Sequence, residues 1–116
     1  MKKFTYPKEE KLKSRSIIKT LFDEGESIKA YPVLIRYLTI ETQTHQVGVS
    51  VSKRKFKRAV DRMRIKRQMR EAYRINKRCL ASSTKKYALM IIYVGKDNGN
   101  TEEIHHKVKS LLKRLI

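Results

Sequence analysis

The feature that most constrains the fold is an apolar run near the C-terminal end, YALMIIYV, at residues 87–94. The run is apolar at odd and even positions alike, so both sides of an extended strand would avoid water. This pattern predicts a strand that is buried on both faces and is therefore central in its sheet. Because the chain has 116 residues, the length of one domain, the layers that cover this strand must come from the same domain.

Two earlier segments predict further strands of the same sheet. Residues 33–40 alternate around strand-forming side chains, and residues 46–52 alternate strictly. The polar segment 41–45 between them most simply forms a hairpin turn. One face of the second strand presents only small residues and is expected to form one wall of a groove: Gly48, Ser50 and Ser52.

Two further segments predict short amphipathic helices at the two ends of the domain. Ser14 is a suitable N-cap for the first helix, and Gly25 can end that helix in the left-handed conformation. Thr101 is expected to cap the last helix. The predicted order is α-β-β-(β)-α-β-α. The fold class is therefore an α/β (α+β) two-layer sandwich, with about four strands and three helices.

Positive charge is concentrated in one segment of the sequence. The formal net charge is +18, and residues 53–78 hold 13 basic and two acidic residues, or +11 in 26 positions. Apolar residues interrupt this segment at helical spacing, among them Ile65, Met69 and Tyr73. The segment therefore predicts an amphipathic helix, roughly from Phe56 to Leu80, with one core face and one cationic face.

The charge predicts a polyanionic partner, with nucleic acid ahead of an anionic membrane surface. No apolar run approaches the roughly 20 residues that a membrane span needs, and the basic start lacks the apolar stretch of a signal peptide. The single cysteine, Cys79, cannot form an internal disulfide, which fits a reducing compartment. We expect one cytoplasmic RNA-binding domain over residues 1–116.

The sequence contains no recognisable catalytic or metal-binding constellation. A nucleophile elbow, a glycine-rich phosphate loop and a metalloprotease helix motif are all missing. His45 falls in the predicted 41–45 turn, and His105 and His106 are adjacent, so a helix would direct them apart. We therefore predict no catalytic residue, no metal site and no cofactor bound by the protein itself.

The basic segment resembles the signature of a known family, the bacterial ribonuclease P protein subunits. The string KRAV-x-R-x-RIKR at residues 57–67, followed by REAYR at residues 70–74, carries the resemblance. The preceding VGVSVSKR at residues 47–54 is similar to that family's strand entering the same helix, and the element order matches. Two positions depart from the pattern, since Met63 replaces a usual Asn and Ile18 replaces a frequent aromatic residue.

The resemblance implies a function as the protein subunit of ribonuclease P, the endonuclease that removes the 5′ leader from precursor tRNA. It implies that the catalytic RNA and its Mg²⁺ ions perform the hydrolysis, that the partners are this RNA and precursor tRNA, and that no membrane or obligate protein partner is needed. It also implies a left-handed β-α-β crossover around the basic helix, against the general rule.

Two sets of residues follow from the resemblance. Those expected to hold the catalytic RNA are Arg62, Met63, Arg64, Lys66, Arg67 and Arg70. Those expected to bind the single-stranded leader, in a cleft between the sheet and the basic helix, are Ile18, Phe22, Tyr37, Ser52, Lys53, Arg54, Arg58 and Lys66.

Three other readings of the charge stay open at this point. A ribosomal-type RNA-binding module would have the same charge without the signature string. A stand-alone metal-dependent nuclease predicts cleavage by the protein with magnesium and no RNA subunit. A membrane-surface helix would be expected to have bulky Trp, Phe or Leu on its apolar face, and this chain has no Trp.

Overall fold

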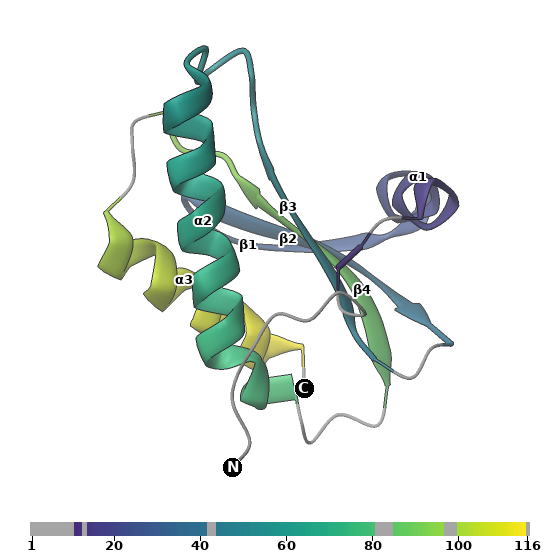
Figure 1. The fold of residues 1–116 in the computed structure, drawn as a ribbon. Coiled ribbons are helices and arrows are strands. Elements are labelled where there is room, and N and C mark those ends of the chain that lie inside the picture. The colour runs from purple at the N-terminus through teal and green to yellow at the C-terminus, as the bar shows by residue number, and fades with distance from the viewer. Residues whose placement is uncertain (1–10, 13, 42–43, 81–84, 97–99, 116) are drawn as a thin grey trace.

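The computed structural model describes residues 11–12, 14–41, 44–80, 85–96 and 100–115. Three helices and four strands make up this part of the chain (Figure 1). In chain order they are α1 (Arg15–Glu24), β1 (Glu26–Ala30), β2 (Val33–Ile40), β3 (Gln46–Val51), α2 (Ala59–Asn76), β4 (Lys86–Tyr93) and α3 (Thr101–Arg114). A 3-10 turn, Lys77–Leu80, continues α2.

The four strands form one mixed sheet in the order β1-β2-β4-β3. β4 contains most of the apolar run and lies between β2, to which it is antiparallel, and β3, to which it is parallel. The prediction of a central strand is therefore confirmed. The predicted hairpin between β2 and β3 is wrong, because β4 separates them. The hairpin is instead formed by β1 and β2, with Ile28 opposite Ile35.

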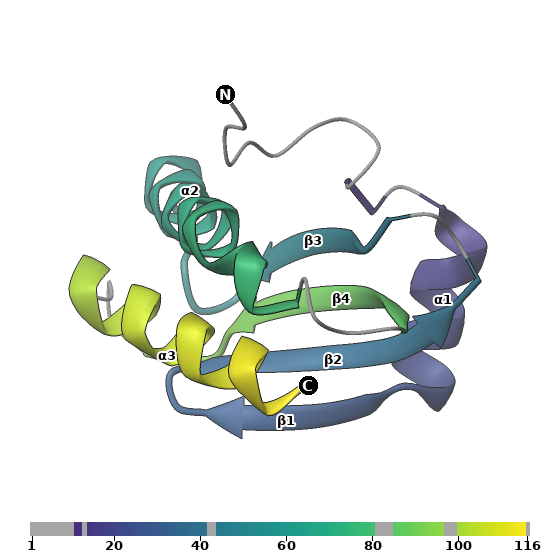
Figure 2. The same cartoon turned by 90° about the horizontal axis from the view of Figure 1, so that it is seen from below.

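Helices α2 and α3 cover one face of the sheet, where the larger core cluster lies. Figure 2 shows these two helices packed together on one side, with α1 at the far end of the sheet. Alternate residues of β4 enter this core: Tyr87, Leu89, Ile91 and Tyr93. The burial of β4 therefore holds the basic helix against the sheet.

The opposite face of the sheet has a smaller cover, made by α1 and Leu12. The other residues of β4, Ala88 and Met90, join Leu12 and Leu21 in a second cluster. Gly48 faces this cluster, because a Cβ built on it would lie 3.2 Å from Met90 Cε and 3.5 Å from Leu12 Cβ. The predicted alternation of β3 is therefore correct, although the small residue at position 48 is covered.

Three predicted helix ends differ from the structure. The basic helix begins at Ala59, three residues after Phe56, because Phe56 is buried in the core as part of the preceding loop and Arg58 is the N-cap. Asn100 caps α3 in place of Thr101, since its side chain accepts from two backbone N–H groups. Gly25 ends α1 with φ −69° and ψ 158°, which is extended and not left-handed.

Gly25 is needed for close approach and not for a special backbone angle. A Cβ built there would lie 2.3 Å from Leu21 O and 3.0 Å from Tyr37 O, and both of these are backbone atoms. Gly25 N–H also donates to Leu21 O at 2.9 Å, so the backbone has little room to shift.

We expect Gly25→Ala to lower the free energy of unfolding by about 1–3 kcal/mol, the range for overpacking. Urea unfolding of the purified protein measures it. Gly48→Ala is the matched control and should cost less, because its nearest contacts are the flexible end of Met90. Equal stability of the Gly25→Ala variant and the parent protein would contradict this explanation of Gly25.

Candidate nucleic-acid interface

Helix α2 buries one side in the core and exposes the rest of its surface. Ile65, Met69, Ala72 and Tyr73 are buried, and they recur at the three- and four-residue spacing of one helix face. Arg67 and Arg70 are exposed on the outer side. The core contacts therefore fix the orientation in which α2 presents its cations.

The residues predicted to hold the catalytic RNA share this helix but differ in exposure. Arg67 and Arg70 are exposed, whereas Arg62, Arg64 and Lys66 are half-buried. Met63 is 60 % exposed and Val60, one turn earlier, is 67 % exposed. The structure thus brings the set together on α2, with an apolar pair on the same outward surface as the arginines.

The loop that leads into α2 is built on Ser52 and Phe56. Ser52 Oγ accepts from the backbone N–H groups of Arg54 and Lys55, at 3.2 and 3.3 Å, and Phe56 N–H donates to Ser52 O. Phe56 is buried, with its ring 5.8 Å from that of Tyr93. The exposed side chains of Lys53, Arg54 and Arg58 are consequently held near the positive end of the α2 dipole.

Arg62 stabilises the start of the helix, a role that the sequence did not indicate. Its Nη1 donates to Phe56 O at 2.7 Å and to Lys57 O at 2.9 Å. Arg58, the N-cap residue, forms no side-chain capping bond. Arg62 therefore ties the cationic loop to the first turns of α2.

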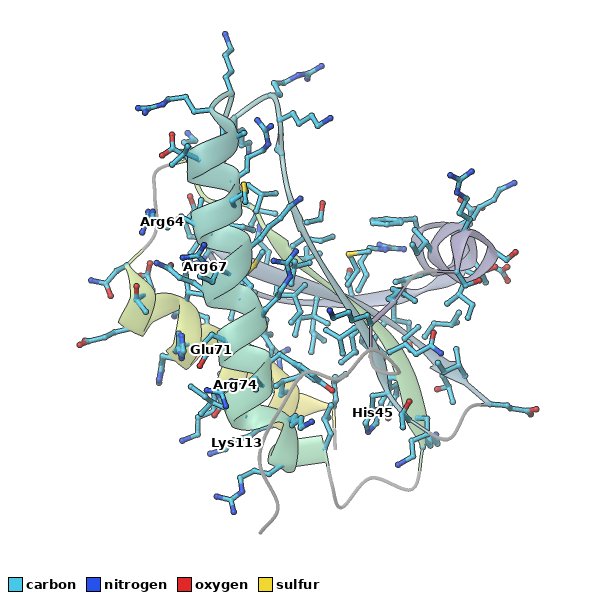
Figure 3. The ribbon with its side chains drawn as sticks, in the orientation of Figure 1. His45, Arg64, Arg67, Glu71, Arg74 and Lys113 are labelled. Atoms are coloured by element: carbon cyan, nitrogen blue, oxygen red, sulfur yellow. The ribbon has the colours of Figure 1, made fainter. Side chains whose placement is uncertain are left out.

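Glu71 and Arg74 form an ion pair on the lower part of α2 (Figure 3). Arg74 Nε lies 3.1 Å from each carboxylate oxygen, and Nη2 also donates to Oε1. These hydrogen bonds hold the pKa of Glu71 below its ordinary value. The carboxylate therefore stays charged at neutral pH, and the pairing is lost only when acidification passes this lowered pKa.

The α1 residues of the predicted leader set lie on the other face of the sheet. Ile18 is half-buried against the second cluster, and Phe22 is 44 % exposed. Beside them the even-numbered residues of β2 line the same face. One of these is Arg36, which donates to the C-terminal carbonyls of α1. Among the described residues, part of this side remains accessible, with Phe22 exposed and Ser50 and Ile92 half-buried; we call this part the open sheet face.

The structure does not bring all of the predicted leader residues together. Tyr37 packs on the α2–α3 face, with its ring centroid 6.0 Å from that of Tyr87, so the sheet separates it from Phe22. Partial burial and the neighbouring Glu26 carboxylate raise the pKa of Tyr37. Lys66 belongs to α2, which packs on that same α2–α3 face. Ser52, Lys53 and Arg54 follow the end of β3, and Arg58 is the N-cap of α2. By strand register, the end of β3 lies at the opposite end of the sheet from the start of β1, which follows α1.

His45 has a structural role. His45 Nδ1 accepts from Tyr87 N–H at 3.1 Å, and the two rings stack at 5.8 Å. Within the described ranges, no group of three or more His, Cys, Asp or Glu could hold a metal ion. The side chain of Cys79 lies outside what the structure describes. None of the described helices is both long and apolar enough to cross a membrane.

Sequence comparison assigns the family. The model of the family described as Ribonuclease P matches residues 6–116. The chain belongs to the ribonuclease P protein family. The ribonuclease P protein component of Dictyoglomus thermophilum is 33 % identical over 113 residues, which cover 97 % of this chain and 89 % of that protein.

Other relatives and solved structures agree with this assignment. The ribonuclease P protein component of Porphyromonas gingivalis W83 is 43 % identical over 82 residues, 66 % of this chain, and the match spans only 58 % of that relative. The RNase P protein from Thermotoga maritima superimposes with a TM-score of 0.77 at 24 % identity, covering 90 % of this chain and 96 % of that chain. The Staphylococcus aureus RNase P protein gives 0.75 at 22 % identity, covering 91 % and 94 %. These structures share the fold.

We expect Glu71→Gln to tighten binding to a large folded RNA by about two- to fivefold, the scale of one exposed charge interaction. The change removes a carboxylate that repels phosphates and removes the negative charge that faces Arg74 on α2. Filter binding at a fixed salt concentration measures the affinity.

The matched control for this prediction is Glu103→Gln, which adds the same unit to the net charge on α3 instead of α2. It should change the affinity less. Equal tightening by the two variants would show that net charge, and not the loss of a carboxylate on α2 itself, is responsible.

Proposed function

We propose that this chain is the protein subunit of ribonuclease P and assists removal of the 5′ leader from precursor tRNA. The outer side of α2 binds the catalytic RNA, through Arg64, Arg67 and Arg70 with Met63 among them. The open sheet face and the end of β3 bind the single-stranded leader. The compartment we propose is the cytoplasm.

The observation that supports this proposal most directly is that α2 buries one side in the core and exposes its cations on the other side. Eleven net positive charges lie in residues 53–78, and the helix in this segment buries one side and presents the other. A fixed row of arginines suits the phosphates of a folded RNA, because a guanidinium can bind two phosphate oxygens at once.

The open sheet face suits a single strand for a different reason. Single-stranded RNA binds where cations follow the backbone and aromatic or apolar side chains meet the bases. Phe22 and Ile18 supply such contacts, and Lys53 and Arg54 supply cations at the end of β3. The binding would tolerate many leader sequences, because stacking distinguishes bases weakly.

We assign hydrolysis of the phosphodiester to the RNA partner and its Mg²⁺ ions. The protein contributes binding and charge. Cations beside two RNAs offset their phosphate repulsion, so the holoenzyme should need less magnesium than the RNA alone.

The experiment that tests the function is precursor-tRNA cleavage at low magnesium by catalytic ribonuclease P RNA, with and without the protein. We expect stimulation that requires the active RNA; protein alone and an inactivated RNA are the controls. Absent stimulation by a folded, RNA-binding protein would favour a ribosomal-type module. Cleavage by protein alone would contradict the assignment of hydrolysis to the RNA.

The salt dependence of binding tests the role of α2. Each phosphate contact contributes about 0.7–0.9 to the slope of log affinity against log salt. We therefore expect Arg67→Ala and Arg70→Ala each to lower this slope by about that amount for the catalytic RNA. Lys109→Ala on α3 should leave it unchanged. An unaltered slope in both α2 variants would remove their guanidinium groups from the interface.

A further inference from the structure

Arg36 is the only charged residue of β2, and its side chain ends at the C-terminus of α1. Its Nε and Nη2 donate to Leu21 O at 3.3 and 3.2 Å. Nη2 also donates to Phe22 O at 2.9 Å and to Gly25 O at 3.0 Å. The last carbonyls of a helix lack intrahelical donors, so one guanidinium both caps α1 and fastens it to β2.

The same guanidinium contacts the ring of Phe22. Its carbon Cζ lies 5.8 Å from the ring centroid, within the range of a cation–π interaction. Phe22 is nevertheless 44 % exposed, the only large apolar residue of α1 that is exposed to this extent among the described residues. Its backbone carbonyl and its ring are both held by Arg36, while part of the aromatic surface remains open to solvent.

We propose that Arg36 is a positioning residue, which holds Phe22 as a stacking platform for an unpaired nucleobase. This inference rests on the proposed function and names a residue outside the predicted leader set. An aromatic ring that is already fixed loses little conformational freedom when a base stacks on it. The adjoining guanidinium places a positive charge 5.8 Å from the ring centroid, where it can attract a nucleotide's phosphate.

A double-mutant cycle in the holoenzyme tests the proposal. The affinity for precursor tRNA with its leader is divided by the affinity for mature tRNA, which gives a leader preference. We expect Phe22→Ala to lower this preference about fivefold or more, the lower end of the stacking range. Arg36→Met should lower it as well. The double variant should lose no more than Phe22→Ala alone, because Arg36 acts through Phe22.

Two further variants separate positioning from charge. Lys109→Met removes one charge from α3, on the other side of the sheet, and should leave the leader preference unchanged. Arg36→Lys keeps the charge but not the planar fork that reaches three carbonyls, and it should restore little of the preference. Full rescue by Arg36→Lys, or additive losses in the double variant, would mean that Arg36 binds RNA by its charge, and would overturn the proposal.

A spectroscopic measurement covers the case in which Arg36→Met folds poorly. The chain has no tryptophan, so Phe22→Trp introduces a single indole reporter. Adding Arg36→Lys to this variant should lower the fluorescence anisotropy of the indole, and a leader oligonucleotide should quench it less strongly. Unchanged anisotropy and quenching would overturn the positioning role.

The outcomes also distinguish this inference from the proposed function on which it rests. If the unmodified holoenzyme shows no leader preference, the proposed function fails, and this inference fails with it. If the preference exists and depends on Phe22 but not on Arg36, only the present inference fails.

Discussion

The burial of one side of α2 against the sheet is the interaction on which the rest of the structure depends. The side chains of Ile65, Met69 and Tyr73 pack in the larger core cluster, to which the central strand β4 also contributes. Each such side chain contributes about 1.5–3 kcal/mol when it leaves water. These contacts offset the mutual repulsion of the basic residues that share the helix. Without these contacts, a helix with this charge would be unstable.

This constraint also divides the surface of the molecule. Because α2 and α3 occupy one face of the sheet, α1 and Leu12 are what cover the other face among the residues that the structure describes. The result is a cationic helix on one side of the sheet and, on the other, a partly exposed surface with the aromatic residue Phe22. In the function that we propose, these two surfaces bind RNA segments of different character.

Much of this arrangement can be predicted from the sequence, because the residues that form the core produce its clearest apolar patterns. The apolar run of β4 fixes the central strand, and the spacing of apolar residues fixes the buried side of α2. The pairing of β2 with β4 could not be predicted, since chain proximity favours a β2–β3 hairpin and only packing of the whole sheet excludes it. The sheet face occupied by Tyr37 likewise depends on register.

The sequence predicted which cations lie on α2, but not the hydrogen bonds and ion pairs that they form. The signature string locates the arginines of α2, yet it does not reveal that Arg62 binds two loop carbonyls or that Glu71 pairs with Arg74. The sequence contains one sign that Arg36 has a specific partner, because it is the only charged residue in VLIRYLTI. Its partners are carbonyls of α1, which no sequence pattern specifies.

The central claim is that the two faces of the sheet bind different RNAs. Photo-crosslinking in the assembled holoenzyme tests it most directly, with a benzophenone attached to a new cysteine at position 67 or 22 in a Cys79→Ala background. We predict that the probe at position 67, on α2, labels the catalytic RNA, and that the probe at position 22, on α1, labels the precursor-tRNA leader. Labelling of the same RNA from both positions would contradict the account.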